Sequence, residues 1–276
     1  MLLEIGMGDA YGAGFEFAPK EKVDAFNNLK AYRKPAFKIL PGCYTDDTQM
    51  SLAIAELLLE KKEWTKLNIA EKFVECFKRD PRLGYAQGFY TLLKSASNGR
   101  ELLKSIKPHS TRNGAAMRAV PLGYIQNIQE LLEIAELQAA TTHDTEIGRK
   151  SAQAVALSAH YFIYNVGKKD NLTEFVEHHT EFIWNSNWTA PVACCGQETV
   201  NALLTVLKKS ASLKDILVNS VAFSGDVDTV AATGLGIGCC SKEYDTALPT
   251  FLYEDLEDGR FGKSYLKVID TQLAAL

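Results

Sequence analysis

The sequence predicts an all-α protein, built as a single compact orthogonal bundle of helices that spans residues 1–276. Apolar residues recur at helical spacing along most of the chain, whereas alternation with a period of two, which would indicate strands, is scarce. No stretch rich in Pro, Gly or Ser and no change in charge density divides the chain. The absence of a repeated sequence period argues against a solenoid.

The first expected helix contains the glycine-rich stretch from Gly6 to Gly14. A dinucleotide-binding loop needs the pattern G-x-G-x-x-G after a strand, but the glycine that follows Gly8 is Gly12, and five preceding residues cannot form a core strand. Small residues would instead let this helix pack closely against another one. That interpretation leaves Asp9 and Glu16 unexplained.

Five further helices are predicted from apolar residues spaced three and four positions apart. Their stripes are Met50, Ala53, Ile54, Leu57 and Leu58; Leu67, Ala70, Phe73, Val74 and Phe77; Ile128, Leu131, Leu132 and Ala135; Phe175, Val176, His179, Phe182 and Ile183; and Val200, Leu203, Leu204 and Leu207. Residues 230–236 are mostly small, which is typical of a helix packed tightly in a core.

Composition excludes several classes of protein. Hydrophobic residues make up 46% of the chain and charged residues 23%, which is enough for a large core and argues against disorder. The formal net charge of −4 argues against sequence-independent binding of nucleic acid. No signal peptide and no membrane-length apolar span are visible, so we expect a cytoplasmic protein, and we expect a monomer.

Two acidic clusters lie far apart in the chain, and each precedes an expected helix. They are Thr45-Asp46-Asp47-Thr48 and Asp226-Val227-Asp228-Thr229. In the simplest interpretation these side chains only cap their helices. A cap, however, needs one acceptor, whereas each cluster supplies two carboxylates and a hydroxyl.

If the two helix starts meet, four carboxylates converge, and cations are needed to keep them ionised. Oxygen ligands without clustered His or Cys select magnesium, manganese or calcium rather than zinc. Two such ions could polarise a leaving group or activate water.

The pattern of these residues resembles the ADP-ribosylglycohydrolase family from about Gly6 to about Gly238. The segment from Gly8 to Glu16 is similar to the family motif G-D-x-x-G-x-x-x-E, whose glutamate is catalytic. The two acidic clusters are similar to the family's T-D-D-T and D-x-D-T metal motifs. The resemblance therefore implies a catalytic Glu16 and two Mg²⁺ or Mn²⁺ ions held by Thr45, Asp46, Asp47, Asp226, Asp228 and Thr229.

The resemblance also implies a set of substrate-binding residues. The segment from Arg112 to Gly123 is similar to the family's N-G-x-x-M-R segment, in which a loop and helix start hold a diphosphate, and free helix N–H groups suit that role. The stretch from Asp80 to Phe89 is similar to D-P-x-x-G-Y-x-x-G in the branch that acts on serine-linked ADP-ribose, and Thr142-His143 to a T-H pair near adenosine. The implied residues are Gly84, Tyr85, Gly88, Asn113, Gly114, Ala115, Met117 and His143.

Each of these segments also has a simpler structural interpretation. Asn113-Gly114 can be an ordinary turn, Tyr85 and Phe89 can be core aromatics, and His143 can be a hydrogen-bonded structural residue. Ser224 stands where the family often has glycine, and its hydroxyl could contact substrate or change nothing. The stretch after Gly238 matches no family pattern.

The activity implied is hydrolysis of the glycosidic bond at C1″ of ADP-ribose attached to a protein or to a small molecule. Glu16 is the first choice for proton transfer, and Asp46 or Asp47 could instead activate water. Two alternatives remain: an inactive ADP-ribose-binding or crystallin-like structural protein, and a two-metal phosphate-ester hydrolase.

Overall fold

The structure is a computed structural model that describes residues 1–35 and 38–276. The described residues form helices and three isolated β-bridges but no strand, which confirms the all-α prediction. The α-helices are α1 (Leu2–Ala13), α2 (Lys20–Phe26), α3 (Asp46–Leu59), α4 (Lys66–Arg79), α5 (Gln87–Ser95), α6 (Gly99–Ser105), α7 (Ile128–Ala140), α8 (Glu146–Ile163), α9 (Leu172–Thr180), α10 (Gly196–Lys209), α11 (Leu213–Ala222), α12 (Val227–Gly238), α13 (Phe251–Glu254) and α14 (Lys263–Leu273). Three short 3-10 helices join them: η1 (Asn113–Ala115), η2 (Val120–Tyr124) and η3 (Lys169–Asn171).

The predicted apolar stripes fall on α3, α4, α7, α9 and α10, with one error. Helix α9 ends at Thr180 because Glu181 adopts a left-handed conformation with φ of 51°. Phe182 and Ile183, which were predicted to continue the stripe, therefore lie beyond the helix, and Ile183 is 79% exposed. The spacing of Phe182 and Ile183 matches a helical period, although a turn separates these two residues from the helix.

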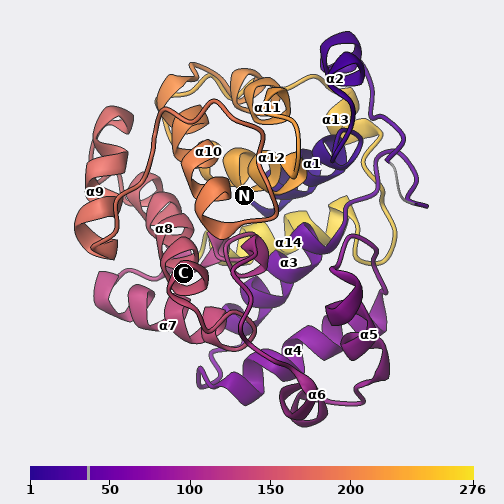
Figure 1. Cartoon of the computed structure of the whole chain (residues 1–276), viewed down its shortest axis with the longest axis vertical. Coiled ribbons are helices and arrows are strands. Elements are labelled where there is room, and N and C mark those ends of the chain that lie inside the picture. Colours follow the sequence, from indigo (N-terminus) through magenta and orange to yellow (C-terminus); the bar gives the residue numbers. More distant parts are fainter. Residues whose placement is uncertain (36–37) are drawn as a thin grey trace.

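Helices α1 and α12 pack against each other near the middle of the molecule, with α3 and α14 beside them (Figure 1). Every residue of α12 is buried. A Cβ placed on Gly12 of α1 would lie 2.4 Å from the Cα of Asp228, so glycine permits this close approach. The contact brings the end of α1 to the start of α12.

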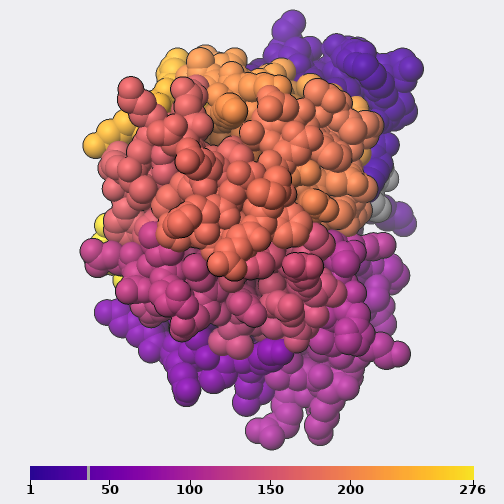
Figure 2. Space-filling model, turned by 60° about the vertical axis from the view of Figure 1, so that its left-hand side comes forward, coloured from indigo at the N-terminus to yellow at the C-terminus, as the bar shows by residue number. Residues whose placement is uncertain are grey.

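The remaining helices surround this centre. Helices α4 to α6 lie at one end of the molecule and α2 at the other, and the side view in Figure 2 shows the same two ends in purple and indigo. No helix in the described part of the chain is long and apolar enough to cross a membrane. All six cysteines are free thiols, and Cys76 is the most deeply buried of them.

Candidate metal centre and substrate cavity

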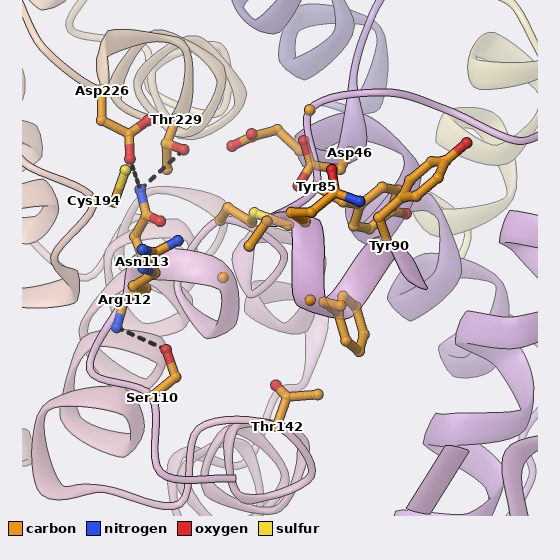
Figure 3. Close-up of a pocket in the computed structure, with 18 of the residues that line it drawn as sticks. Asp46, Tyr85, Tyr90, Ser110, Arg112, Asn113, Thr142, Cys194, Asp226 and Thr229 are labelled. Carbon is orange, nitrogen blue, oxygen red and sulfur yellow. Dashed lines mark hydrogen bonds between the residues drawn. The ribbon is translucent and has the colours of Figure 1, made fainter. Parts of the chain in front are cut away.

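A cavity of about 1100 Å³ opens where the two acidic clusters meet. Its acidic wall combines Glu16, which follows α1, with residues at the starts of α3 and α12. The carboxylates that line it are Glu16, Asp46, Asp47, Asp226 and Asp228. Figure 3 shows Asp46 on one side of this wall and Asp226 with Thr229 on the other. Segments nearly the full length of the chain apart thus converge, as the sequence predicted.

The start of α3 is capped by a residue from another helix. Asp9 of α1 accepts hydrogen bonds from the backbone N–H groups of Thr45 and Thr48, at 2.8 and 3.0 Å, and from both hydroxyls, at 2.7 and 2.5 Å. Thr45 itself makes no side-chain cap, and neither does Asp226 at the start of α12. Thr45 and Asp226 therefore do not act as simple caps, although Asp228 accepts a hydrogen bond from the Thr229 N–H at 2.9 Å in the first turn of α12. Thr45 is buried and does not line the cavity formed by the described residues.

The start of α12 is held by the Asn113 side chain. Its Nδ2 donates to Asp226 Oδ2 at 2.9 Å, to Thr229 Oγ1 at 3.1 Å and to Thr199 Oγ1 at 3.3 Å, as Figure 3 shows for the first two. The sequence predicted a substrate-binding loop at Asn113 but not this contact, because nothing in an Asn-Gly pair indicates that its side chain reaches α12.

The carboxylates repel one another in a buried setting. Burial in the first place, and neighbouring carboxylates in the second, raise the pKa values of Asp46, Asp47 and Asp228 well above the ordinary value of 3.8. Burial, followed by the charges of Asp226 and Asp9, raises the pKa of Glu16 to about 8. Ionising this group together without cations is therefore unfavourable.

The donor set fits hard divalent ions. The Oδ1 atom of Asp47 is buried without a hydrogen-bond partner, which is costly unless a cation binds it. One carboxylate oxygen each from Glu16, Asp226 and Asp228 lies within 4.8 Å of the others, close enough to share an ion. This group includes Glu16, which the sequence had assigned to proton transfer, and it does not include Asp46 or Asp47.

The Asp80 to Phe89 stretch borders the acidic wall. Gly84, with φ of +109°, lies so close to Asp46 that a Cβ there would stand 2.0 Å from its Oδ1 atom. Gly88 also lines the cavity, and a Cβ on it would meet open space. Tyr85 lines the cavity too, but its hydroxyl donates to Gln49 at 2.7 Å and its ring packs on Phe77.

The other predicted substrate-binding residues divide into two groups. Asn113, Gly114, Met117 and His143 line the cavity. Ala115 and Ser224 do not line it within the described chain: the Ala115 side chain is buried, and the Ser224 carbonyl accepts a hydrogen bond from the Val192 N–H at 3.0 Å. The Ser224 hydroxyl was one candidate for substrate contact, and its position does not favour that role.

Several lining residues were not predicted. They comprise apolar residues, four cations and one thiol. These residues include Tyr90, Leu92 and Ile106; Lys38, Lys107, Arg112 and Arg118; and Cys194. Arg118 is itself part of the N-G-x-x-M-R segment and Arg112 directly precedes it; for the others no pattern in the sequence pointed to the cavity.

Comparisons with known proteins agree with this arrangement. A family model described as ADP-ribosylglycohydrolase matches residues 5–274. The chain is 28% identical over 195 residues to "ADP-ribosylhydrolase ARH3" of Gallus gallus, covering 64% of this chain and 53% of that protein. It is 25% identical to the "ADP-ribosyl-[dinitrogen reductase] glycohydrolase" of Rhodospirillum rubrum, covering 96% and 89%.

The matched region thus spans about half the length of the Gallus gallus relative. A solved structure titled "ADP-ribosylglycohydrolase-related protein complex" superposes with a TM-score of 0.78 at 20% identity, covering 99% of this chain and 95% of that one. This likeness supports the fold.

Proposed function

Because this chain belongs to the ADP-ribosylglycohydrolase family, we propose that it is a metal-dependent hydrolase that removes ADP-ribose from a modified protein or a small conjugate by cleaving the glycosidic bond at C1″. One observation carries the proposal: five carboxylates from three distant segments line one cavity, and among them a buried Asp47 oxygen has no partner. A protein that kept only the fold would have no need to retain this unfavourable cluster.

Two Mg²⁺ or Mn²⁺ ions would be held by Thr45, Asp46, Asp47, Asp226, Asp228 and Thr229. When bound, such ions orient the ribose hydroxyls and stabilise developing charge. Asn113 supports this arrangement, because its amide holds the carboxylate of Asp226 and the hydroxyl of Thr229 in place. Asp9 does the same for the start of α3.

The diphosphate would be held by backbone rather than by the Asn113 side chain, which is engaged with α12. The N–H group of Gly114, near the start of the short helix η1, has no acceptor in the described part of the chain. Free N–H groups at the start of a helical turn bind phosphate without a basic side chain. Gly114 lines the cavity, so this phosphate-binding turn lies beside the acidic wall.

Glu16 is our first choice for the proton transfer that bond cleavage needs. It lines the cavity, and one of its carboxylate oxygens lies within 4.8 Å of oxygens of Asp226 and Asp228, so a carboxyl group is available at the acidic wall for general acid–base work. Its closeness to the two aspartates also makes it a candidate ligand. Asp46 or Asp47 could then activate water, and substitution separates these roles.

For the acceptor, we propose a preference for O-linked, serine-type ADP-ribose. Support comes from the Asp80 to Phe89 stretch, whose Gly84 lies against Asp46 at the acidic wall. Discrimination between acceptors must arise at the rim of the cavity, where Phe17 and Leu83 are 55% and 40% exposed.

The decisive experiment is to assay matched ADP-ribosylated peptides and a generic phosphate ester, each with magnesium and with chelator. We expect magnesium-dependent release of ADP-ribose and no hydrolysis of the ester. Cleavage of the ester alone would favour the phosphate-ester alternative, and binding of ADP-ribose without release would favour an inactive binding protein.

A further inference from the structure

Arg118 is a buried cation without a carboxylate partner among the described residues. It is 1% exposed, and its guanidinium lies 4.6 Å from the centre of the Phe73 ring. Its Nε donates to the side-chain oxygen of Gln138 at 2.6 Å, and its Nη2 donates to the Gln138 carbonyl at 3.0 Å. Gln138 is itself fixed by donating to the Ala115 carbonyl. These contacts hold the guanidinium rigidly beside the cavity.

The next contact sets the direction of a hydrogen-bond chain. Nη2 of Arg118 also lies 2.7 Å from the Thr142 hydroxyl oxygen, and a guanidinium can only donate. Thr142 therefore accepts from Arg118, and its own hydroxyl proton is free for Nδ1 of His143 at 2.6 Å. Among the described residues the Thr142 hydroxyl has no other acceptor, so the arrangement that uses its proton makes Nδ1 of His143 the acceptor and leaves the ring proton on Nε2.

The Nε2 edge of the ring lies against Gly114, which lines the cavity. A Cβ placed on Gly114 would lie 2.8 Å from His143 Cε1 and 3.0 Å from Nε2, which puts this edge of the ring against the phosphate-binding turn. His143 lines the cavity, and no described residue is hydrogen-bonded to its Nε2. Burial, followed by the charges of Arg118 and Arg112, lowers the pKa of His143 to about 3, so the ring is neutral at physiological pH.

We propose that Arg118 and Thr142 are positioning residues that hold His143 as a neutral Nε2–H donor aimed at an acceptor oxygen of bound ADP-ribose. This inference rests on the proposed function for the identity of the ligand. The Arg118 guanidinium donates to the Thr142 hydroxyl, the hydroxyl donates to Nδ1 of His143, and Nε2–H of His143 is the third donor. Each hydrogen bond in this chain polarises the next one. The opposite tautomer would present a lone pair to the ligand oxygen and repel it.

The first test is the tautomer of His143 in the ligand-free protein. Nitrogen-15 NMR distinguishes the two neutral tautomers and the imidazolium, and the chain has only five histidines. A His143→Asn variant assigns the signal. We expect the Nε2–H tautomer at pH 7.5 in the native protein. The Nδ1–H tautomer or an imidazolium in the native protein would overturn the proposal.

The second test compares a matched pair of variants at Thr142. Thr142→Ser keeps the hydroxyl, whereas Thr142→Val keeps the shape and removes it. We expect the serine variant to retain the tautomer and the affinity for ADP-ribose measured by calorimetry. The valine variant should lose the fixed tautomer and bind ADP-ribose roughly three- to tenfold more weakly, the range for one hydrogen bond.

Native affinity in Thr142→Val would show that the chain of donors does not position His143 for the ligand. The measurement on the native protein decides the tautomer even if the valine variant does not fold. A failure of the proposed function can be distinguished from a failure of this inference. If the native protein shows the expected tautomer but does not bind ADP-ribose, the assignment of the ligand is wrong, whereas the hydrogen-bond chain from Arg118 to His143 is still supported.

Discussion

Removing divalent ions should make the stability of this protein fall as pH rises above neutrality. Burial and neighbouring carboxylates raise the pKa of Glu16 from its ordinary value of 4.5 to about 8, and those of Asp46, Asp47 and Asp228 also lie above their ordinary values. A group whose pKa is higher in the folded protein contributes stability below its unfolded pKa and loses it as pH rises through the folded pKa. For Glu16 that window lies between about pH 4.5 and about pH 8.

The size of the effect follows from the pKa of Glu16. Between pH 7 and pH 8.5, deprotonation of Glu16 alone should cost roughly 1 kcal/mol of unfolding free energy, which lowers Tm by about 2 °C in a protein of this size. The aspartates should add to this loss. His143 does not oppose it, because above pH 7 an unfolded histidine is already mostly neutral, as the folded one with a pKa of about 3 is.

The assay is thermal unfolding at pH 7 and pH 8.5, in chelator and in saturating magnesium, for the native protein and Glu16→Gln. We expect the loss of Tm in chelator to be larger than in magnesium, since bound cations stabilise the ionised carboxylates. Glu16→Gln should lose less Tm than the native protein in chelator. The reasoning is refuted if Tm in chelator rises over this interval, or if magnesium stabilises the protein equally at both pH values.

Three further predictions concern activity. Activity should require magnesium or manganese, and Asp47→Ala or Asp228→Ala should abolish both metal binding by calorimetry and turnover; full activity in excess chelator would contradict this. Glu16→Gln should keep the fold and ligand affinity but lose turnover by roughly two to four decades in a steady-state assay, and a near-native rate would move the role to Asp46 or Asp47. Cleavage rates measured side by side on matched peptides should be higher for serine-linked than for arginine-linked ADP-ribose. A clear preference for arginine would mean that the Asp80 to Phe89 stretch does not indicate which linkage the protein cleaves.

Much of the fold could be predicted because helical periodicity is a local property. Apolar stripes located α3, α4, α7 and α10, and small residues indicated that α1 and α12 would each be closely packed. One predicted stripe ran too far, beyond Thr180, because a left-handed residue broke the helix while the apolar spacing continued. The positions of apolar residues indicate which side chains are buried together, but they do not show the backbone conformation of a single residue such as Glu181.

The chemistry of the candidate site was also present in the sequence, as two pairs of aspartates with threonines and a glutamate after a glycine-rich helix. Residue types alone predicted oxygen ligands and hard cations. Their convergence was inferred from an excess of carboxylates over what capping needs. The structure places all five carboxylates in one cavity wall.

Only the tertiary structure decided which side chains support that wall. Asp9 caps a helix through a contact with Thr45, 36 residues later in the chain, and Asn113 holds Asp226 across 113 residues of chain. The partner of Arg118 at Thr142, and through it the tautomer of His143, likewise depend on how α7 and the segment after it pack. Such contacts join residues that are distant in sequence, and their geometry is set by helix packing, so no local pattern encodes them. The sequence determined the helices and the ligand chemistry, and packing determined which carboxylate stays unpartnered and which ring nitrogen faces the substrate.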